Sequence, residues 1–206
     1  MARPKSDIDR RILRAARKRF LHEGVDAASL RDIARDAKTS VGMIQYWFPS
    51  KDALFMSVVE EIYGGLLAGI SRALEPDVPI EQRVQRLYLR LGTMTDDEFT
   101  VLRIVLREAM VSAKRLKKLS KRFLDGHVPL IIATVVEGMA TGKFDSTLPP
   151  MAAAMALAAL GIVPAVMMKR IAPVLPPGLD LPSPERGAAL FAEVLFHGLS
   201  PRKRKR

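Results

Sequence analysis

The sequence contains no cysteine, which excludes disulfide bonds and thiol chemistry and fits a protein of the reducing cytoplasm. Aromatic residues are few, with one tryptophan and three tyrosines among 206 residues. No stretch shows the convincing alternation of apolar and polar residues that a half-buried strand requires. The first residues, MARPKSDIDRR, lack the apolar run of a secretory signal. These absences favour an all-α cytoplasmic protein.

Signatures of catalysis and of metal binding are missing as well. The three histidines, His22, His127 and His197, are scattered along the chain, and no nucleophile and base converge on a recognisable site. Residues 138–143, GMATGK, have the wrong spacing for a phosphate loop, and Phe144 stands where that motif needs Ser or Thr. We therefore expect no enzyme activity, no cofactor and no metal.

Positive charge is in excess and is unevenly distributed. The chain has 33 Lys and Arg against 22 Asp and Glu, a net charge of +11. Residues 1–55 carry twelve basic against seven acidic side chains, residues 202–206 are RKRKR, and the part between them is almost balanced. Phosphates favour such basic ends because bound cations release condensed counterions. The tail 201–206 is either an additional DNA-binding arm or a solvated, disordered end.

The most informative stretch is residues 29–55, SLRDIARDAKTSVGMIQYWFPSKDALF. Ser29 with Asp32 three residues later predicts a capped helix, and Lys38-Thr39-Ser40 predicts a turn in which Thr39 or Ser40 caps a second helix. Pro49 should end that helix, and Ser50 should cap a third. Two short helices joined by a tight turn are typical of a helix-turn-helix DNA reader, whose second helix enters the major groove.

The second helix has two expected faces. Val41 and Ile44 are three residues apart and should point inward, which leaves the remaining polar side chains available to DNA. Phe48 is predicted to be core, and Trp47 is predicted either as core or as a phosphate contact. We expect Gly42 both to let the backbone approach DNA closely and to help two helices pack.

Residues 42–52, GMIQYWFPSKD, resemble the DNA-binding domain of the tetracycline-repressor (TetR) family of bacterial transcriptional regulators. As in that family, an amphipathic helix with Ile8, Ile12 and Phe20 precedes the motif and ends at Gly24. Gln45 and Trp47 depart from the residues usual at their positions, so the operator sequence does not carry over. The residues expected to contact DNA are Ser29, Arg31, Thr39, Ser40, Gly42, Gln45, Tyr46, Trp47 and Lys51.

The rest of the chain is predicted to be helical throughout, giving an all-α protein of about nine helices. The expected domains are a helix-turn-helix domain at 1–55, a helical-bundle ligand-binding and dimerisation domain at 56–200, and the basic tail. The expected helices after the motif cover residues 51–75, 80–93, 96–110, 114–123, 128–142, 148–171 and 184–199, and residues 173–184, with five prolines, form a loop.

The resemblance implies a ligand pocket inside the bundle and a dimer formed by the last two long helices. Residues 146–168 are uncharged and long enough to span a bilayer, but their many alanines with Gly161 and Pro164 favour burial and helix packing over a membrane span. The pocket candidates are Met94, Phe99, Met110, Phe123, His127 and Met139. The interface candidates are Ala152, Ala156, Leu160, Leu190, Val194 and Leu195.

The sequence therefore predicts a ligand-responsive transcriptional regulator. It would bind a palindromic double-stranded DNA operator as a homodimer, act as a repressor by family default, and be released by a small apolar effector. A DNA-architectural protein without sequence preference, or a protein-interaction module that reuses the fold, are the alternatives.

Overall fold

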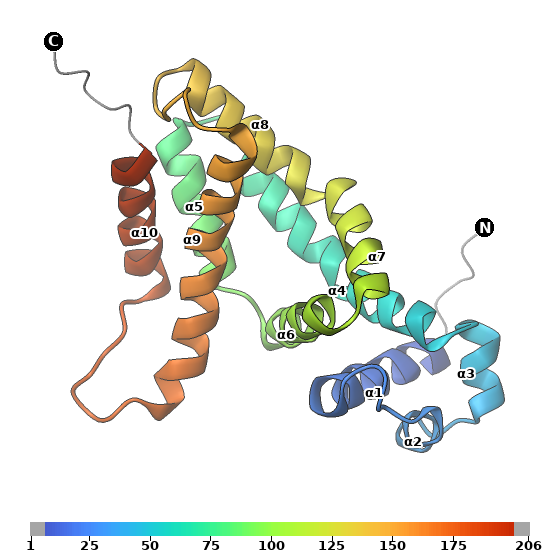
Figure 1. Ribbon diagram of the computed structural model, residues 1–206. Coiled ribbons are helices and arrows are strands. Elements are labelled where there is room, and N and C mark those ends of the chain that lie inside the picture. Colours follow the sequence, from blue (N-terminus) through green and yellow to red (C-terminus); the bar gives the residue numbers. More distant parts are fainter. Residues whose placement is uncertain (1–6, 200–206) are drawn as a thin grey trace, which may run out of the picture. The chain divides into compact units, whose positions relative to one another are not determined.

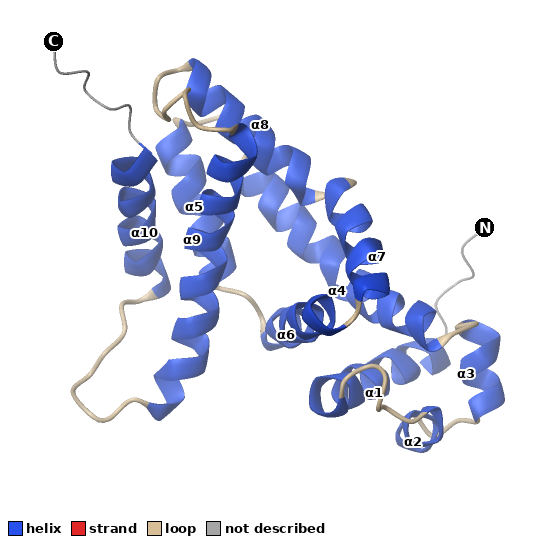
Figure 2. Cartoon of the chain, viewed as in Figure 1, coloured by secondary structure: helices blue, strands red, loops and turns tan. Residues whose placement is uncertain are grey.

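A computed structural model describes residues 7–199 of the protein. Over this range the chain forms ten α-helices and one short 3-10 helix, with no strand (Figures 1 and 2). The expected all-α architecture is confirmed, with one helix more than predicted. Two compact units are formed from interleaved parts of the chain: residues up to 66 together with 95–122, and residues 67–94 together with those from 123 onward.

The first unit contains α1 (Asp7–Glu23), α2 (Leu30–Asp36), α3 (Val41–Trp47), the first part of α4 (Lys51–Ala73), α6 (Asp96–Val111) and nearly all of α7 (Ala113–Leu124). Its core is apolar, with Ile12, Phe20, Ile44 and Phe55 almost fully buried. The rings of Phe20 and Phe55 meet edge to face with centroids 6.5 Å apart, which fixes α4 against α1.

Helix starts in this unit follow the local sequence. Ser29 caps α2 by accepting from the N–H of Arg31, and Ser50 caps α4 by accepting from the N–H of Ala53. The cap of α6 is Thr95, which forms a reciprocal capping box with Glu98 through bonds of 3.2 Å and 2.9 Å. This Thr-x-x-Glu pattern is visible in the sequence and identifies the start of α6.

The second unit contains the end of α4, α5 (Ile80–Gly92), α8 (His127–Ala140), α9 (Pro150–Ile171), the 3-10 helix Ala172–Val174 and α10 (Pro184–Leu199). Helices α5, α9 and α10 pack against one another. Tyr88 of α5 donates a hydrogen bond to the Leu157 carbonyl of α9 over 2.9 Å, and burial raises the pKa of its phenol well above the ordinary value. The rings of Phe144 and Phe196 stack at 5.2 Å.

Candidate DNA-binding surface

The turn between α2 and α3 has a left-handed residue that is not glycine. Lys38 has a φ of 52°. Its N–H donates to the Arg35 carbonyl over 3.1 Å, and the N–H of Thr39 donates to the Ala34 carbonyl over 2.9 Å. This pair of bonds is the Schellman arrangement that closes a helix C-terminus. The tight turn predicted from Lys38-Thr39-Ser40 is therefore present, and it fixes the direction in which α3 leaves α2.

Helix α3 has one buried side chain and a polar exposed face. Ile44 is buried, as expected, while Ser40, Gly42, Gln45 and Tyr46 are exposed. The Ser40 hydroxyl caps the helix by accepting from the N–H of Met43 over 3.1 Å. The hydroxyl oxygen thus accepts a hydrogen bond within the protein, while the O–H group can still donate a hydrogen bond to a phosphate.

Gly42 differs from its expected role in helix packing. A Cβ built on Gly42 would meet only the Ser40 hydroxyl oxygen, at 3.8 Å. No neighbouring helix therefore requires a glycine at this position, and the packing half of the expectation is wrong. Close approach of the protein backbone to DNA at Gly42 stays a prediction.

The aromatic residues at the end of α3 divide between core and surface. Phe48 is buried, as predicted, and Trp47 is half-buried. Tyr46, at 58% exposure, packs edge to face against the Trp47 indole with centroids 5.7 Å apart. The indole therefore packs against the exposed tyrosine while remaining only partly covered, and a phosphate contact by Trp47 stays a prediction.

Lys51 lies at the start of α4, where free backbone N–H groups and the helix dipole favour a phosphate. Its ammonium donates a hydrogen bond to the Asp26 carbonyl over 2.6 Å. The side chain thus joins α4 to the loop that follows α1. An ammonium has three donors, so one bond to the protein leaves others for DNA.

Carboxylates beside this helix start are each paired with a cation. Lys114 contacts Asp52 at 2.7 Å and holds the pKa of the Asp52 carboxyl below its ordinary value. Arg115 does the same for the pKa of Asp26 through a two-pronged contact. Pairing removes the repulsion that unpaired carboxylates would exert on a phosphate. Both cations come from α7, which lies outside the segment 1–55 predicted to bind DNA.

The remaining predicted DNA contacts lie at the two helix starts of the motif. Ser29 is half-buried at the cap of α2, Arg31 is exposed in its first turn, and Thr39 is half-buried before α3. All belong to the first unit.

The six pocket candidates are divided between the two units. Phe99 and Met94 are buried, but Met110 is 88% exposed, so its assignment to a pocket is wrong. Met110 is near the C-terminal end of α6, and the apolar periodicity of that helix does not show that its last turn is uncovered. In the second unit, the rings of Phe123 and His127 lie with centroids 5.0 Å apart, and Met139 is half-buried.

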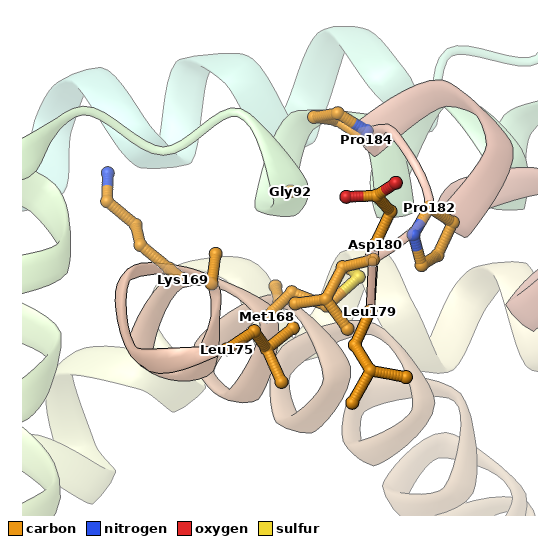
Figure 3. Close-up of a pocket in the computed structure, with 11 residues that line it drawn as sticks. Gly92, Met168, Lys169, Leu175, Leu179, Asp180, Pro182 and Pro184 are labelled. Atoms are coloured by element: carbon orange, nitrogen blue, oxygen red, sulfur yellow. The ribbon is translucent and has the colours of Figure 1, made fainter. Parts of the chain in front are cut away.

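A cavity of about 360 Å³ lies in the second unit, between α9 and the loop that leads to α10 (Figure 3). Its lining is mostly apolar, with Lys169 and Asp180 as the charged members, and none of the predicted pocket residues belongs to it. The other lining residues are Gly92, Ala165, Met168, Ala172, Leu175, Leu179, Leu181, Pro182 and Pro184.

The interface candidates are only partly on the surface. Ala152, Leu190 and Val194 are exposed, and Ala156 and Leu160 are half-buried. Leu195 is buried within its own chain, at 1% exposure, so it belongs to the protomer core and its assignment to an interface is wrong.

An exposed apolar row runs along α9 at a spacing of four residues, which the sequence did not identify. We call it the α9 row; it consists of Met151, Met155, Ala159, Val163, Met167 and Ile171. Because α9 is apolar on all sides, hydrophobic periodicity does not show which of its faces is buried. By length and composition alone, residues 51–73 and 150–174 could each cross a membrane.

Comparison with known proteins relates the first unit to DNA-binding regulators. Residues 12–58 match the family model described as bacterial regulatory proteins, tetR family. The chain is 31% identical over 100 residues to the HTH-type nicotine-responsive transcriptional repressor HdnoR of Paenarthrobacter nicotinovorans, a match that covers 47% of this chain and 52% of that protein. It is 46% identical over 52 residues to the HTH-type transcriptional repressor NicS of Pseudomonas putida, or 25% of this chain and 24% of that one.

The matches thus span about half the length of the first of these relatives and a quarter of the second. Among solved structures, the transcriptional regulator FadR of Bacillus subtilis, in complex with stearoyl-CoA, superposes with a TM-score of 0.74. The superposition covers 92% of this chain and 98% of FadR at 14% sequence identity. At that identity the likeness establishes a shared fold.

Proposed function

We propose that this chain is a member of the TetR family and acts as a ligand-responsive transcriptional repressor of the cytoplasm that binds a palindromic operator as a homodimer, because residues 12–58 match the tetR-family model. The observation that carries this proposal is the helix-turn-helix at residues 30–47, in which α3 exposes Ser40, Gln45 and Tyr46 around a single buried anchor, Ile44. An exposed polar helix face held by a buried anchor is what major-groove reading requires.

Direct reading of bases falls to the exposed side chains of α3. The Gln45 amide is suited to an adenine, since its oxygen and nitrogen match the donor and acceptor of that base in the major groove. Ser29, Arg31 and Lys51 are suited to the flanking phosphates, because they lie at helix starts where free N–H groups and positive charge coincide. These contacts would set the register of α3 on the duplex.

Dimerisation follows from the small size of one reading helix. A single α3 contacts only a few base pairs, so a unique operator needs two copies at a fixed separation. The α9 row, with Leu190 and Val194 of α10, offers an exposed apolar surface for a second copy of the chain. A two-fold axis would bury the same surface of each protomer. The small side chains of Ala152 and Ala156 would allow close helix approach, and Leu160 would add apolar contact.

The effector is proposed to be a small apolar molecule bound in the helical bundle. One relative is named as responsive to nicotine, and the FadR structure holds stearoyl-CoA. Met94, Phe123, His127 and Met139, which all belong to the second unit, remain candidates for its pocket. The 360 Å³ cavity beside α9 is a second candidate, since its volume falls within the usual range of ligand sites. An effector releases DNA only if it prefers the DNA-incompetent conformation.

The proposal is tested by selecting duplexes from a random-sequence library with the purified wild-type protein. We expect an inverted repeat, with two half-sites spaced by about one helical turn or slightly more. A DNA-architectural protein would enrich no sequence, although it would bind with strong salt dependence. A protein-interaction module would retain no duplex at all.

A further inference from the structure

Arg115, in the first turn of α7, is a buried cation that contacts three carboxylates. Its Nη1 donates to Asp26 over 3.0 Å and to Asp52 over 3.1 Å, while its Nη2 donates to the other oxygen of Asp26. Its Nε lies 2.7 Å from Glu108. The arginine is 4% exposed, and Glu108 is 1% exposed. These contacts all lie inside the first unit.

The three carboxylates come from three different pieces of the chain. Asp26 lies in the loop after α1, Asp52 in the first turn of α4, and Glu108 in α6. Residues 27–51, between the first two, contain the whole of α2, the turn and α3. One guanidinium therefore holds both ends of the segment that carries the helix-turn-helix, and it ties them to α6.

Further bonds at the same place link α6 to the end of α1. The N–H of Val25 donates to Glu108 over 3.0 Å, and Arg107 donates to the Glu23 carbonyl over 3.1 Å. Gly24 between them has a φ of 83°, and an added Cβ would lie 2.9 Å from the Arg107 guanidinium. The left-handed backbone at Gly24 disfavours any other residue there, and a side chain would also displace the Arg107 guanidinium.

Stability alone does not account for this arrangement. Burial of an ion pair costs desolvation energy that its attraction often only balances, and apolar residues of similar volume are frequently at least as stabilising. The cluster also fixes orientation. Planar, two-pronged contacts between guanidinium and carboxylate set the angle between the groups that they join.

We propose that Arg115 is a positioning residue for DNA reading, and that the DNA-reading unit of this protein includes α6 and α7 as well as residues 1–55. This inference rests on the proposed function. Arg115 holds the loop after α1 and the start of α4 at a fixed separation, so that α3 and the phosphate-facing start of α4 meet one duplex together. Its buried side chain acts through Asp26 and Asp52 and does not contact DNA.

The test compares Arg115→Met with Arg115→Lys and with Arg122→Met as a matched control. Arg122 lies two turns further along α7 and also pairs with α4, through Glu60, but it touches neither end of the reading segment. Each full-length variant is titrated against the duplex that the wild type selects. We expect Arg115→Met to lose affinity by about 10- to 100-fold, as coupled networks do, Arg115→Lys to lose less, and Arg122→Met to stay near wild type.

The salt dependence of binding separates positioning from a direct contact. Because Arg115 reaches no phosphate, the slope of log affinity against log salt should remain that of the wild type in Arg115→Met. A slope reduced by about one unit would overturn the inference, since it would mean that the arginine itself binds a phosphate. Wild-type affinity of Arg115→Met would overturn it as well.

A second variant keeps the test valid if Arg115→Met does not fold. Asp26 is exposed, so Asp26→Asn weakens one of the two end contacts with little effect on the core. We expect an intermediate loss of affinity with an unchanged salt slope, and wild-type affinity of this variant would overturn the inference. If the wild-type protein selects no DNA sequence, both the proposed function and this inference fail. If the wild-type protein selects a sequence and the variants bind that duplex with wild-type affinity, only this inference fails.

Discussion

The side chain of Glu108 in α6 accepts a hydrogen bond from the backbone N–H of Val25, which follows the end of α1, over 3.0 Å. The two residues are 83 positions apart in the sequence. A buried N–H without a partner would cost free energy, and here a carboxylate from a distant helix supplies the acceptor. The same carboxylate lies beside Arg115, so one side chain serves both a loop and a buried cation.

Replacement of Glu108 by Ala should therefore be strongly destabilising. The variant leaves the Val25 N–H without its acceptor and removes one of the three carboxylates that contact Arg115, and breaking a buried ion pair typically costs about 3–5 kcal/mol of unfolding free energy. Glu108→Gln keeps an acceptor for Val25 and should cost less. Urea unfolding measures the free energy of unfolding of both variants. Glu60→Ala, which removes an exposed ion pair with Arg122, is the control, and its unfolding free energy should lie within about 1 kcal/mol of the wild-type value. Equal stability of all three variants would contradict the role of Glu108.

The close crossing of α5 and α9 depends on Gly161. A Cβ at this position would lie 2.8 Å from two ring carbons of Tyr88 and 2.9 Å from Leu91. Overpacking of this kind costs about 1–3 kcal/mol, more than the gain of about 1 kcal/mol in helix propensity. Gly161→Ala should thus lower the melting temperature. Gly64→Ala, where a Cβ meets nothing within 4 Å, should raise it; the reverse order would refute the close packing at Gly161.

Gln45 is the side chain of α3 best suited to read a base. Gln45→Ala should weaken binding to the selected duplex by about 1–3 kcal/mol and relax preference at one base position in each half-site. The repeated selection experiment with this variant measures both effects. A loss of affinity with an unchanged sequence profile would instead make Gln45 a phosphate contact.

Sequence alone predicted the helix-turn-helix in detail because its signals are local. Ser40 and Ser50 cap the helices they were expected to cap, Gly24 has a positive φ, and Phe48 and Ile44 are buried. The caps and the turn depend on neighbours within four residues, and the burial of Ile44 and Phe48 was predicted from their apolar side chains at helical spacing. The family match at residues 12–58 lies over the same stretch.

Features that depend on distant residues could not be predicted in this way. Nothing near Arg115 in the sequence indicates that it meets Asp26 and Asp52, because those contacts join residues 89 and 63 positions apart. Met110 was wrongly assigned to a pocket and Leu195 to an interface for a related reason. The sequence shows that these residues are apolar, but their exposure depends on which other helix covers them. The basic tail at 201–206 lies outside the described residues, and its role stays a prediction.

The α9 row yields a prediction about the dimer. Met155→Glu should give a monomer with wild-type helix content. Met155 is 66% exposed in the single chain, so a charge there is solvated in the monomer and would be buried without a partner only in the dimer interface. Light scattering with circular dichroism measures both properties. Met110→Glu, at a more exposed site on α6, should stay dimeric, whereas Leu195→Asp should unfold the protomer itself. A dimeric Met155→Glu protein would remove α9 from the interface.

The central claim is that this protein reads DNA sequence, and competitive titration of the wild type tests it most directly. The selected duplex is compared with a scrambled duplex of the same length and composition at physiological salt. We expect the selected duplex to bind about 1,000-fold more tightly or better, with both affinities falling as salt rises. Equal affinity for the two duplexes would contradict sequence reading by α3 and would assign the protein to the architectural class.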